Sequence, residues 1–100
     1  MVKMKLDDVT IITKRTLDVK ERCIDDELLL MDEQAGTIFN LNSIGAAVWR
    51  LLEQPKSPVE IIQVLAAAFP GVAKKQVEKD VYELIGKLND MGLVFLQAER

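Results

Sequence analysis

The sequence predicts an α+β fold in which a three-stranded antiparallel sheet is followed by three helices. Two observations carry this prediction: the main β-prone runs lie before position 42, and the clear helix-start signals lie at or after it. The chain has 100 residues, 49% of them hydrophobic, which is enough for one small core and too little for two. We therefore expect a single domain over residues 1–100, with residues 1–8 flexible.

Three segments predict the strands. Residues 9–13 (VTIIT) are β-branched, whereas the charged residues 16–21 predict a turn. Residues 23–31 end in an apolar run that is ambiguous between strand and helix by periodicity alone. The turn cluster DEQAG at residues 32–36 and the β-prone Thr37–Leu41 follow it, so these two runs most simply pair as an antiparallel hairpin.

Capping signals mark the helices. Asn42 or Ser43 can cap the first helix, which carries Trp49 as a predicted core anchor and must end by Pro55. The second helix opens with Ser-Pro-Val-Glu at residues 57–60, a capping serine with proline at the first helical position and glutamate at the third, and Pro-Gly at residues 70–71 ends it.

A third helix is expected over residues 73–91, with Gly92 as its left-handed cap. Apolar residues recur along it at helical spacing and form one narrow stripe: Val77, Val81, Leu84, Leu88 and Met91. The apolar residues 93–96 (LVFL) that follow are expected to return against the core as an extended segment.

The residue inventory excludes most enzyme chemistries. With no histidine and only Cys23, the usual zinc, haem and transition-metal sites lack ligands, and a histidine-activated nucleophile is impossible. Acidic clusters at residues 7–8, 25–27 and 32–33 lie in loop-like contexts that favour solvated charge over a carboxylate pair, and no phosphate-binding glycine loop occurs. We predict a chain that is not an enzyme and has no catalytic residue, metal or cofactor.

Cellular location follows from similar exclusions. No run of eighteen apolar residues predicts a membrane span, and the first residues lack the pattern of a secretory signal. A lone cysteine is compatible with a reducing compartment. The sequence therefore predicts a cytoplasmic protein without a membrane partner.

Three strands before three helices resemble a winged helix-turn-helix, which raises a DNA-binding regulator as one function. A DNA-reading helix needs surplus positive charge. In the third helix four lysines are balanced by four acidic residues, and the net charge of the chain is −3, so we expect no nucleic-acid partner. An assembly module that pairs through an exposed strand edge is the other alternative, as a monomer–homodimer equilibrium.

Three segments together resemble one protein family. LNSIGAAVWRLLE at residues 41–53, SPVEII from Ser57 and DVYELIGKLNDMGLV at residues 80–94 look like the PqqD family, small peptide-binding proteins named for pyrroloquinoline quinone biosynthesis. The chain departs from the quinone-pathway members, which usually have an aromatic-rich second strand and a Pro-Glu-Gly-like turn where this chain has residues 28–36. We therefore expect a broader family member.

The resemblance implies a non-catalytic recognition element for ribosomally made precursor peptides. Such proteins capture the leader of the precursor as an added β-strand and present it to a modifying enzyme, often a radical-SAM enzyme. Carried onto this chain, the receiving strand consists of Thr37, Ile38, Phe39, Asn40 and Leu41. The family also implies that the third helix forms one wall of the peptide groove.

Helical geometry locates one candidate wall. At about 100° per residue, with Val77 set to zero, the core stripe spans roughly −40° to +40°. Four residues follow at roughly 80° to 140° and are the predicted peptide contacts: Ile85, Glu78, Asn89 and Tyr82. In the alternative reading Ile85 widens the core and Tyr82 covers the second helix. The opposite flank, with Asp80, Glu83 and Lys87, is expected to be solvated.

Overall fold

The computed structural model describes residues 10–97. Along this part of the chain the elements are β1 (Ile11–Lys14), β2 (Val19–Ile24), β3 (Glu27–Asp32), β4 (Thr37–Leu41), α1 (Ser43–Leu51), α2 (Pro58–Ala68), α3 (Lys74–Asp90) and β5 (Val94–Gln97). The predicted flexible residues 1–8, and the first residue of the predicted strand 9–13, lie outside the described residues.

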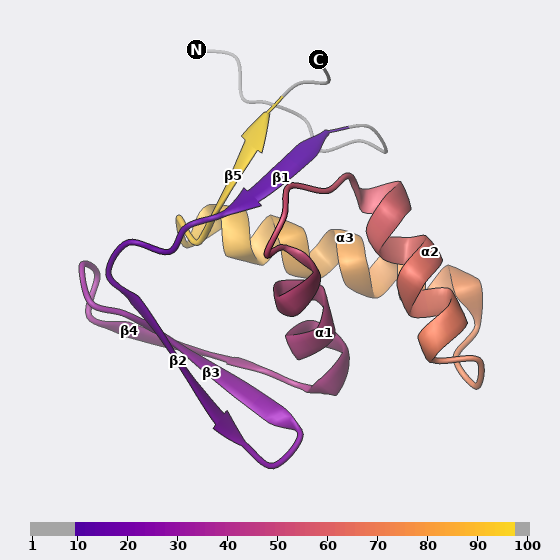
Figure 1. Cartoon of the computed structure of the whole chain (residues 1–100), viewed down its shortest axis with the longest axis horizontal. Coiled ribbons are helices and arrows are strands. Elements are labelled where there is room, and N and C mark those ends of the chain that lie inside the picture. Colours follow the sequence, from indigo (N-terminus) through magenta and orange to yellow (C-terminus); the bar gives the residue numbers. More distant parts are fainter. Residues whose placement is uncertain (1–9, 98–100) are drawn as a thin grey trace.

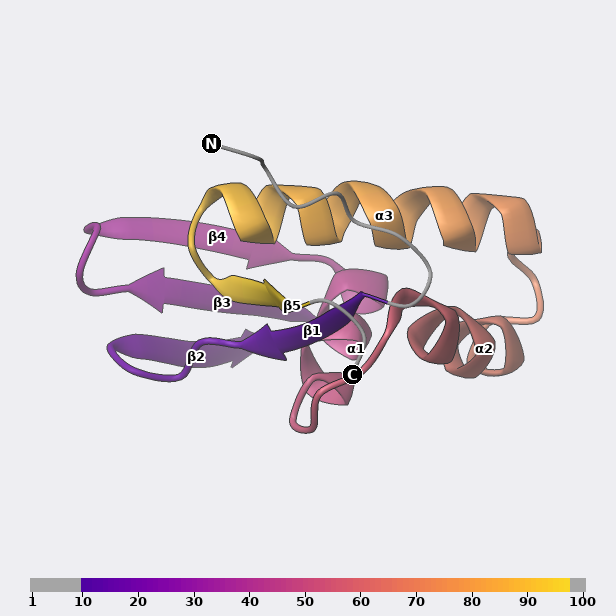
Figure 2. The same ribbon diagram turned by 90° about the horizontal axis from the view of Figure 1, so that it is seen from above.

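The described strands form two antiparallel sheets, one of three strands in the order β2-β3-β4 and one that pairs β1 with β5 (Figure 1). The predicted α+β class, with a three-stranded antiparallel sheet and three helices, is confirmed. The helices lie on one side of the three-stranded sheet, and α3 runs alongside β4 (Figure 2).

The membership of the three-stranded sheet differs from the sequence prediction. The first predicted strand is β1, which pairs with β5, and the third strand of the larger sheet is β2, which overlaps the segment predicted to turn. Five of the six β2 residues are exposed, so the strand carries the charged side chains that are usual at a sheet edge. The turn expected over residues 16–21 ends at Asp18, and a second turn follows β2 at Asp25; the φ angles of these two residues are 58° and 55°.

The register of β3 against β4 sets which side chains enter the core. Leu28 pairs with Leu41, and Leu30 pairs with Phe39. Leu28, Leu30 and Leu41 are buried under the helices, whereas the alternate residue Ile38 is 66% exposed on the other face. Because β4 is the last strand in the sheet order, one side of its backbone pairs with no strand among residues 10–97.

The predicted helices and their caps are confirmed. The Asn42 Oδ1 atom accepts a hydrogen bond from the Gly45 N–H at 2.8 Å, and Ser57 and Glu60 form the capping box of α2. Gly92 follows α3 with a φ of 71°. The expected extended segment at residues 93–96 corresponds to β5.

Trp49 is a core residue, as predicted. Its side chain is 1% exposed, and its indole N–H donates to the Glu21 Oε2 atom at 2.9 Å, which ties α1 to β2. The Lys14 ammonium group lies 5.0 Å from the centre of the Trp49 ring. The tryptophan therefore joins α1 to both sheets.

Candidate functional site

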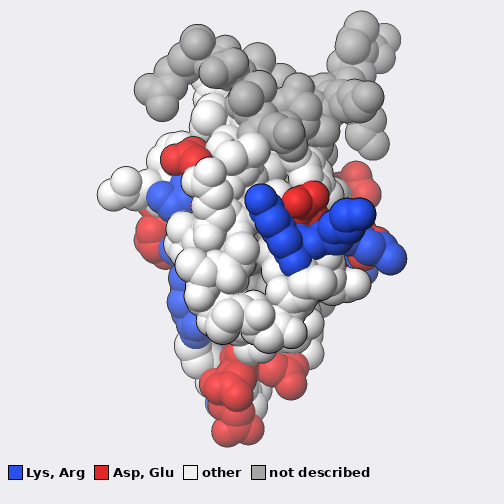
Figure 3. Space-filling view, turned by 90° about the vertical axis from the view of Figure 1, so that its right-hand side faces the viewer, with Lys and Arg blue, Asp and Glu red and all other residues white. Residues whose placement is uncertain are grey.

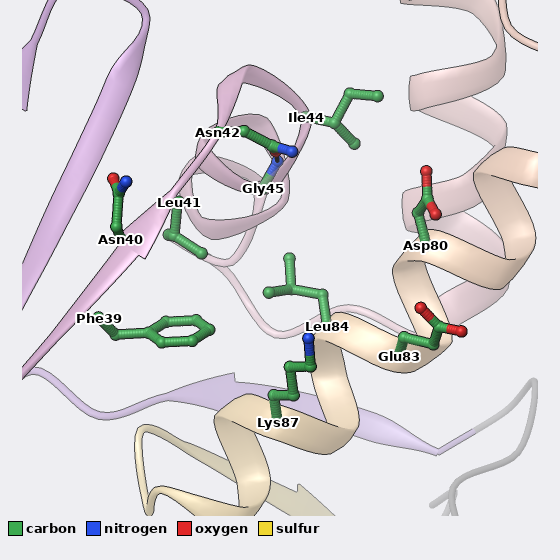
Figure 4. A pocket seen from close by; sticks show the side chains of 10 residues that line it. All are labelled: Phe39, Asn40, Leu41, Asn42, Ile44, Gly45, Asp80, Glu83, Leu84 and Lys87. Carbon is green, nitrogen blue, oxygen red and sulfur yellow. Dashed lines mark hydrogen bonds between the residues drawn. The ribbon is translucent and has the colours of Figure 1, made fainter.

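A groove of about 280 Å³ lies between β4, the start of α1 and α3 (Figure 4). It begins where the open edge of β4 meets the helices. Its lining residues are Phe39, Asn40, Leu41, Asn42, Ile44, Gly45, Asp80, Glu83, Leu84 and Lys87.

The base of the groove is apolar. Phe39, Ile44 and Leu84 are half-buried and pack against the hydrophobic core, and Leu41 is buried. Figure 4 shows the Phe39 ring and the Leu84 side chain directed toward the space between β4 and α3. A ligand that covers half-buried apolar side chains at a concave surface removes apolar area from water, which favours binding. The base of the groove therefore suits the apolar side chains of a bound peptide.

A close approach of α1 to β4 shapes one end of the groove. Gly45 is buried, and a Cβ atom at this position would lie 3.1 Å from Leu41 Cδ2 and 3.4 Å from the capping Asn42 Oδ1. Glycine therefore permits the first turn of α1 to start directly against the end of β4. The capping asparagine holds this turn from the other side.

A polar tether holds the opposite end. The Arg15 guanidinium donates through Nη2 to Asp32 Oδ1 at 2.5 Å and through Nη1 to the Gly92 carbonyl at 3.1 Å. Asp32 also accepts the backbone N–H groups of Gln34 and Ala35 in the turn before β4. The Arg15 guanidinium, with these two N–H groups, holds the pKa of Asp32 below its ordinary value. This tether links the turn before β4 to the residue after α3, and so connects the two elements whose side chains line the groove.

Charged side chains from α3 form the rim. The Asp80 carboxylate is half-buried and accepts a hydrogen bond from Gln76 Nε2 at 2.8 Å. Glu83 and Lys87 are exposed, and in the described part of the chain neither side chain forms a hydrogen bond or an ion pair. Sequence geometry placed these three residues on a solvated flank, and the structure places that flank at the groove.

The structure places the two sets of predicted peptide contacts, on β4 and on α3, in different surroundings. Thr37–Leu41 is an edge strand, and its residues Phe39, Asn40 and Leu41 line the groove. The four residues predicted on α3 do not lie beside it: Ile85 is fully buried, Asn89 lines no described hollow, and Glu78 and Tyr82 line a second hollow of about 240 Å³ against α2. The positions of Ile85 and Tyr82 thus agree with the alternative prediction, in which Ile85 widens the core and Tyr82 covers α2.

The predicted α3 residues lie away from the groove because helical angles identify the buried stripe of a helix but not which neighbouring element each flank contacts. That assignment depends on how α2 and β4 pack on either side of the stripe. Leu84, which sequence analysis assigned to the core, is the groove residue that could have been found, because it lies on the side of the stripe that faces Asp80 and Lys87.

Comparison with known proteins agrees with this architecture. The family model described as Coenzyme PQQ synthesis protein D (PqqD) matches residues 27–94, which is more than half of the chain. The chain belongs to the PqqD family. The matched segment runs from β3 to the first residue of β5 and contains every residue that lines the groove. A search of curated protein sequences gave no match.

Two solved structures resemble this PqqD-family protein along most of its length. TbiB1 in complex with the TbiA(β) leader peptide is 34% identical, with a TM-score of 0.70 over 82% of this chain and 94% of TbiB1. A lasso peptide synthetase B1 complexed with the leader peptide is 25% identical, with a TM-score of 0.68 over 84% of this chain and 96% of that one. Both relatives were therefore captured with a peptide ligand.

The charge distribution agrees poorly with nucleic-acid binding. On the face seen in Figure 3, Lys and Arg side chains are interspersed with Asp and Glu among many uncharged residues, and acidic side chains gather at the lower end, formed by the β2–β3 turn. Among residues 10–97, no group of three His, Cys, Asp or Glu side chains is placed to hold a metal ion. None of the helices in this range has both the length and the apolar character that a membrane-spanning helix needs.

Proposed function

We propose that this protein binds the leader of a ribosomally synthesised precursor peptide and presents it to a separate modifying enzyme. The observation that carries this function is the open edge of β4 beside a groove with an apolar base. Backbone groups at the edge can hydrogen-bond an incoming strand, and the groove can accept its alternate side chains. This role requires no catalytic group on the chain and places the protein in the cytoplasm, where the precursor is made.

We further propose that the precursor belongs to the lasso peptide class. Support comes from the two similar structures, which are a lasso peptide synthetase component and TbiB1, each with a leader peptide. The departure of residues 28–36 from the quinone-pathway pattern agrees with this assignment. The partner enzyme would then be one that matures lasso precursors, whereas a radical-SAM partner stays a prediction from the family as a whole.

An amide chemical-shift titration of the isotopically labelled protein tests the proposal. The peptides are the TbiA(β) leader and the leader of the short precursor encoded nearest this gene. We expect saturable shifts in Thr37–Leu41 and in the part of α3 around Leu84. Shifts confined to the second hollow, at Glu78 and Tyr82, would instead favour the flank predicted from helical geometry.

A matched pair of variants sharpens the test. Leu84→Ser removes apolar surface from the groove and is expected to weaken leader binding about tenfold, since about 1.4 kcal/mol of apolar contact is lost. Val64→Ser makes the same kind of change on the exposed side of α2, outside the groove, and is expected to leave affinity unchanged. If no leader shifts any amide at large excess and the gel-filtration volume depends on concentration, the assembly module replaces this proposal.

A further inference from the structure

The groove has acidic side chains toward one end, Asp80 and Glu83, and a basic side chain, Lys87, toward the other, because these residues follow one another along α3. β4 and α3 run in opposite directions (Figure 2), so Phe39 lies at the Lys87 end of the groove and Ile44 at the Asp80 end (Figure 4). Antiparallel pairing is the more stable arrangement for an added strand. A strand antiparallel to β4 runs in the same direction as α3, and therefore passes Asp80 and Glu83 before it reaches Lys87.

The rim charges are available to a ligand. A glutamate four residues before a lysine is the spacing at which helical side chains usually pair with each other. Glu83 and Lys87 have this spacing, yet they form no ion pair within the described part of the chain. Both line the groove, so both charges can meet side chains of a bound peptide.

The spacing of the two charges matches a β-strand. Four residues of α-helix rise about 6 Å along the axis. Two residues of an extended strand rise about 6.7 Å, and residues two apart project on the same face. A peptide strand that presents one side chain to Glu83 therefore presents the next side chain on that face to Lys87.

Resting on the leader-binding function proposed above, we infer that the α3 rim selects leaders in which a basic residue precedes an acidic residue by two positions. The basic side chain meets Glu83, with the Asp80 carboxylate beside it, and the acidic side chain meets Lys87. The residue between them faces the outer side of the sheet. The reversed order places like charges opposite each other at both positions.

Opposite charges in contact at a solvated surface attract each other weakly, and like charges repel by a similar amount. Exchanging the two peptide residues changes both contacts from attractive to repulsive. The exchange is therefore expected to weaken binding roughly tenfold at low ionic strength, and less in high salt, because both rim side chains are partly solvated.

The test uses random twelve-residue peptides displayed on phage and selected on three proteins. The first is the wild type. The second is E83K/K87E, which exchanges the rim charges without changing net charge. The third is K74E/E78K, a control that exchanges a lysine and a glutamate at the same spacing on the same helix, in the opposite order and at the second hollow. Circular dichroism verifies that all three are folded. Selected sequences are then resynthesised in both charge orders and titrated by fluorescence polarisation.

The expected result is enrichment of Lys or Arg two positions before Asp or Glu on the wild type and on K74E/E78K, and the reversed order on E83K/K87E. Bound peptides with no charge order, or with the same order on the rim variant, would overturn the inference while the leader-binding function stands. Enrichment of the acidic-then-basic order on the wild type would also overturn it. If no peptide is enriched and the leaders cause no amide shifts, the leader-binding function fails and the inference fails with it.

Discussion

Replacement of Trp49 by phenylalanine tests whether this residue holds the helices onto the sheet. Trp49 is 1% exposed, packs in the core, and donates its indole N–H to Glu21. Phenylalanine keeps an aromatic ring over the same contacts but removes the second ring and the only donor. The substitution therefore reduces packing and removes one hydrogen bond without introducing a buried charge.

The expected loss can be estimated from these two changes. Loss of about 50 Å² of buried apolar area at about 25 cal/mol per Å² corresponds to about 1.3 kcal/mol. A hydrogen bond to a charged group contributes about 1.5–3 kcal/mol. We use the lower end, about 1.5 kcal/mol, because Glu21 is partly solvated. The sum is about 2–3 kcal/mol, a large fraction of the roughly 5–15 kcal/mol that stabilises a domain of this size.

Urea denaturation followed by far-UV circular dichroism measures this loss, and thermal unfolding should show a decrease in Tm of about 10–15 °C. The control is Glu21→Gln, which retains an acceptor for the indole N–H and is expected to cost less than about 1 kcal/mol. A loss below about 1 kcal/mol for Trp49→Phe would refute the packing argument. Equal losses for the two variants would show that the charge of Glu21, 3.8 Å from Lys14, dominates instead.

Three further predictions concern the segments that position β4. Asn42→Ala removes the acceptor of the Gly45 N–H and is expected to cost about 1 kcal/mol of unfolding free energy; an unchanged urea midpoint would argue against the cap. Gly36→Ala forces alanine into a φ of 70° and should cost about 1 kcal/mol, whereas Gly71→Ala, which also meets no atom within 4 Å, should cost less than about 0.5 kcal/mol; equal effects would contradict the backbone argument. Because the folded pKa of Asp32 lies below the unfolded value of about 3.9, its contribution is present above that pH and is lost as pH falls through the folded pKa. Asp32→Asn should therefore flatten the decline of stability below about pH 4, and parallel acid titrations of the two proteins would count against this reasoning.

Sequence patterns predicted the helices better than the strands. The caps at Asn42 and Ser57 and the terminator at Gly92 depend on residues within one turn of each helix end, so local chemistry was sufficient. The first half of β2, residues 19–21, was predicted to turn because the strand is stabilised by pairing with β3, a contact that its own charged sequence does not display. β1 was identified as a strand but was counted in the three-stranded sheet, because its actual partner, β5, lies at the other end of the chain.

The candidate site likewise combines features that local sequence predicts with features that depend on distant contacts. The sequence by itself determined the class of fold, the strand Thr37–Leu41, the capped junction into α1 and the family, because each depends on short runs of neighbouring residues. Only the tertiary structure decided that Leu84 and Lys87, and not Glu78 and Tyr82, lie beside β4. The flank of α3 that carries Tyr82 and Ile85 is the more apolar one and packs toward α2, which leaves the charged flank with Asp80, Glu83 and Lys87 to face the strand edge.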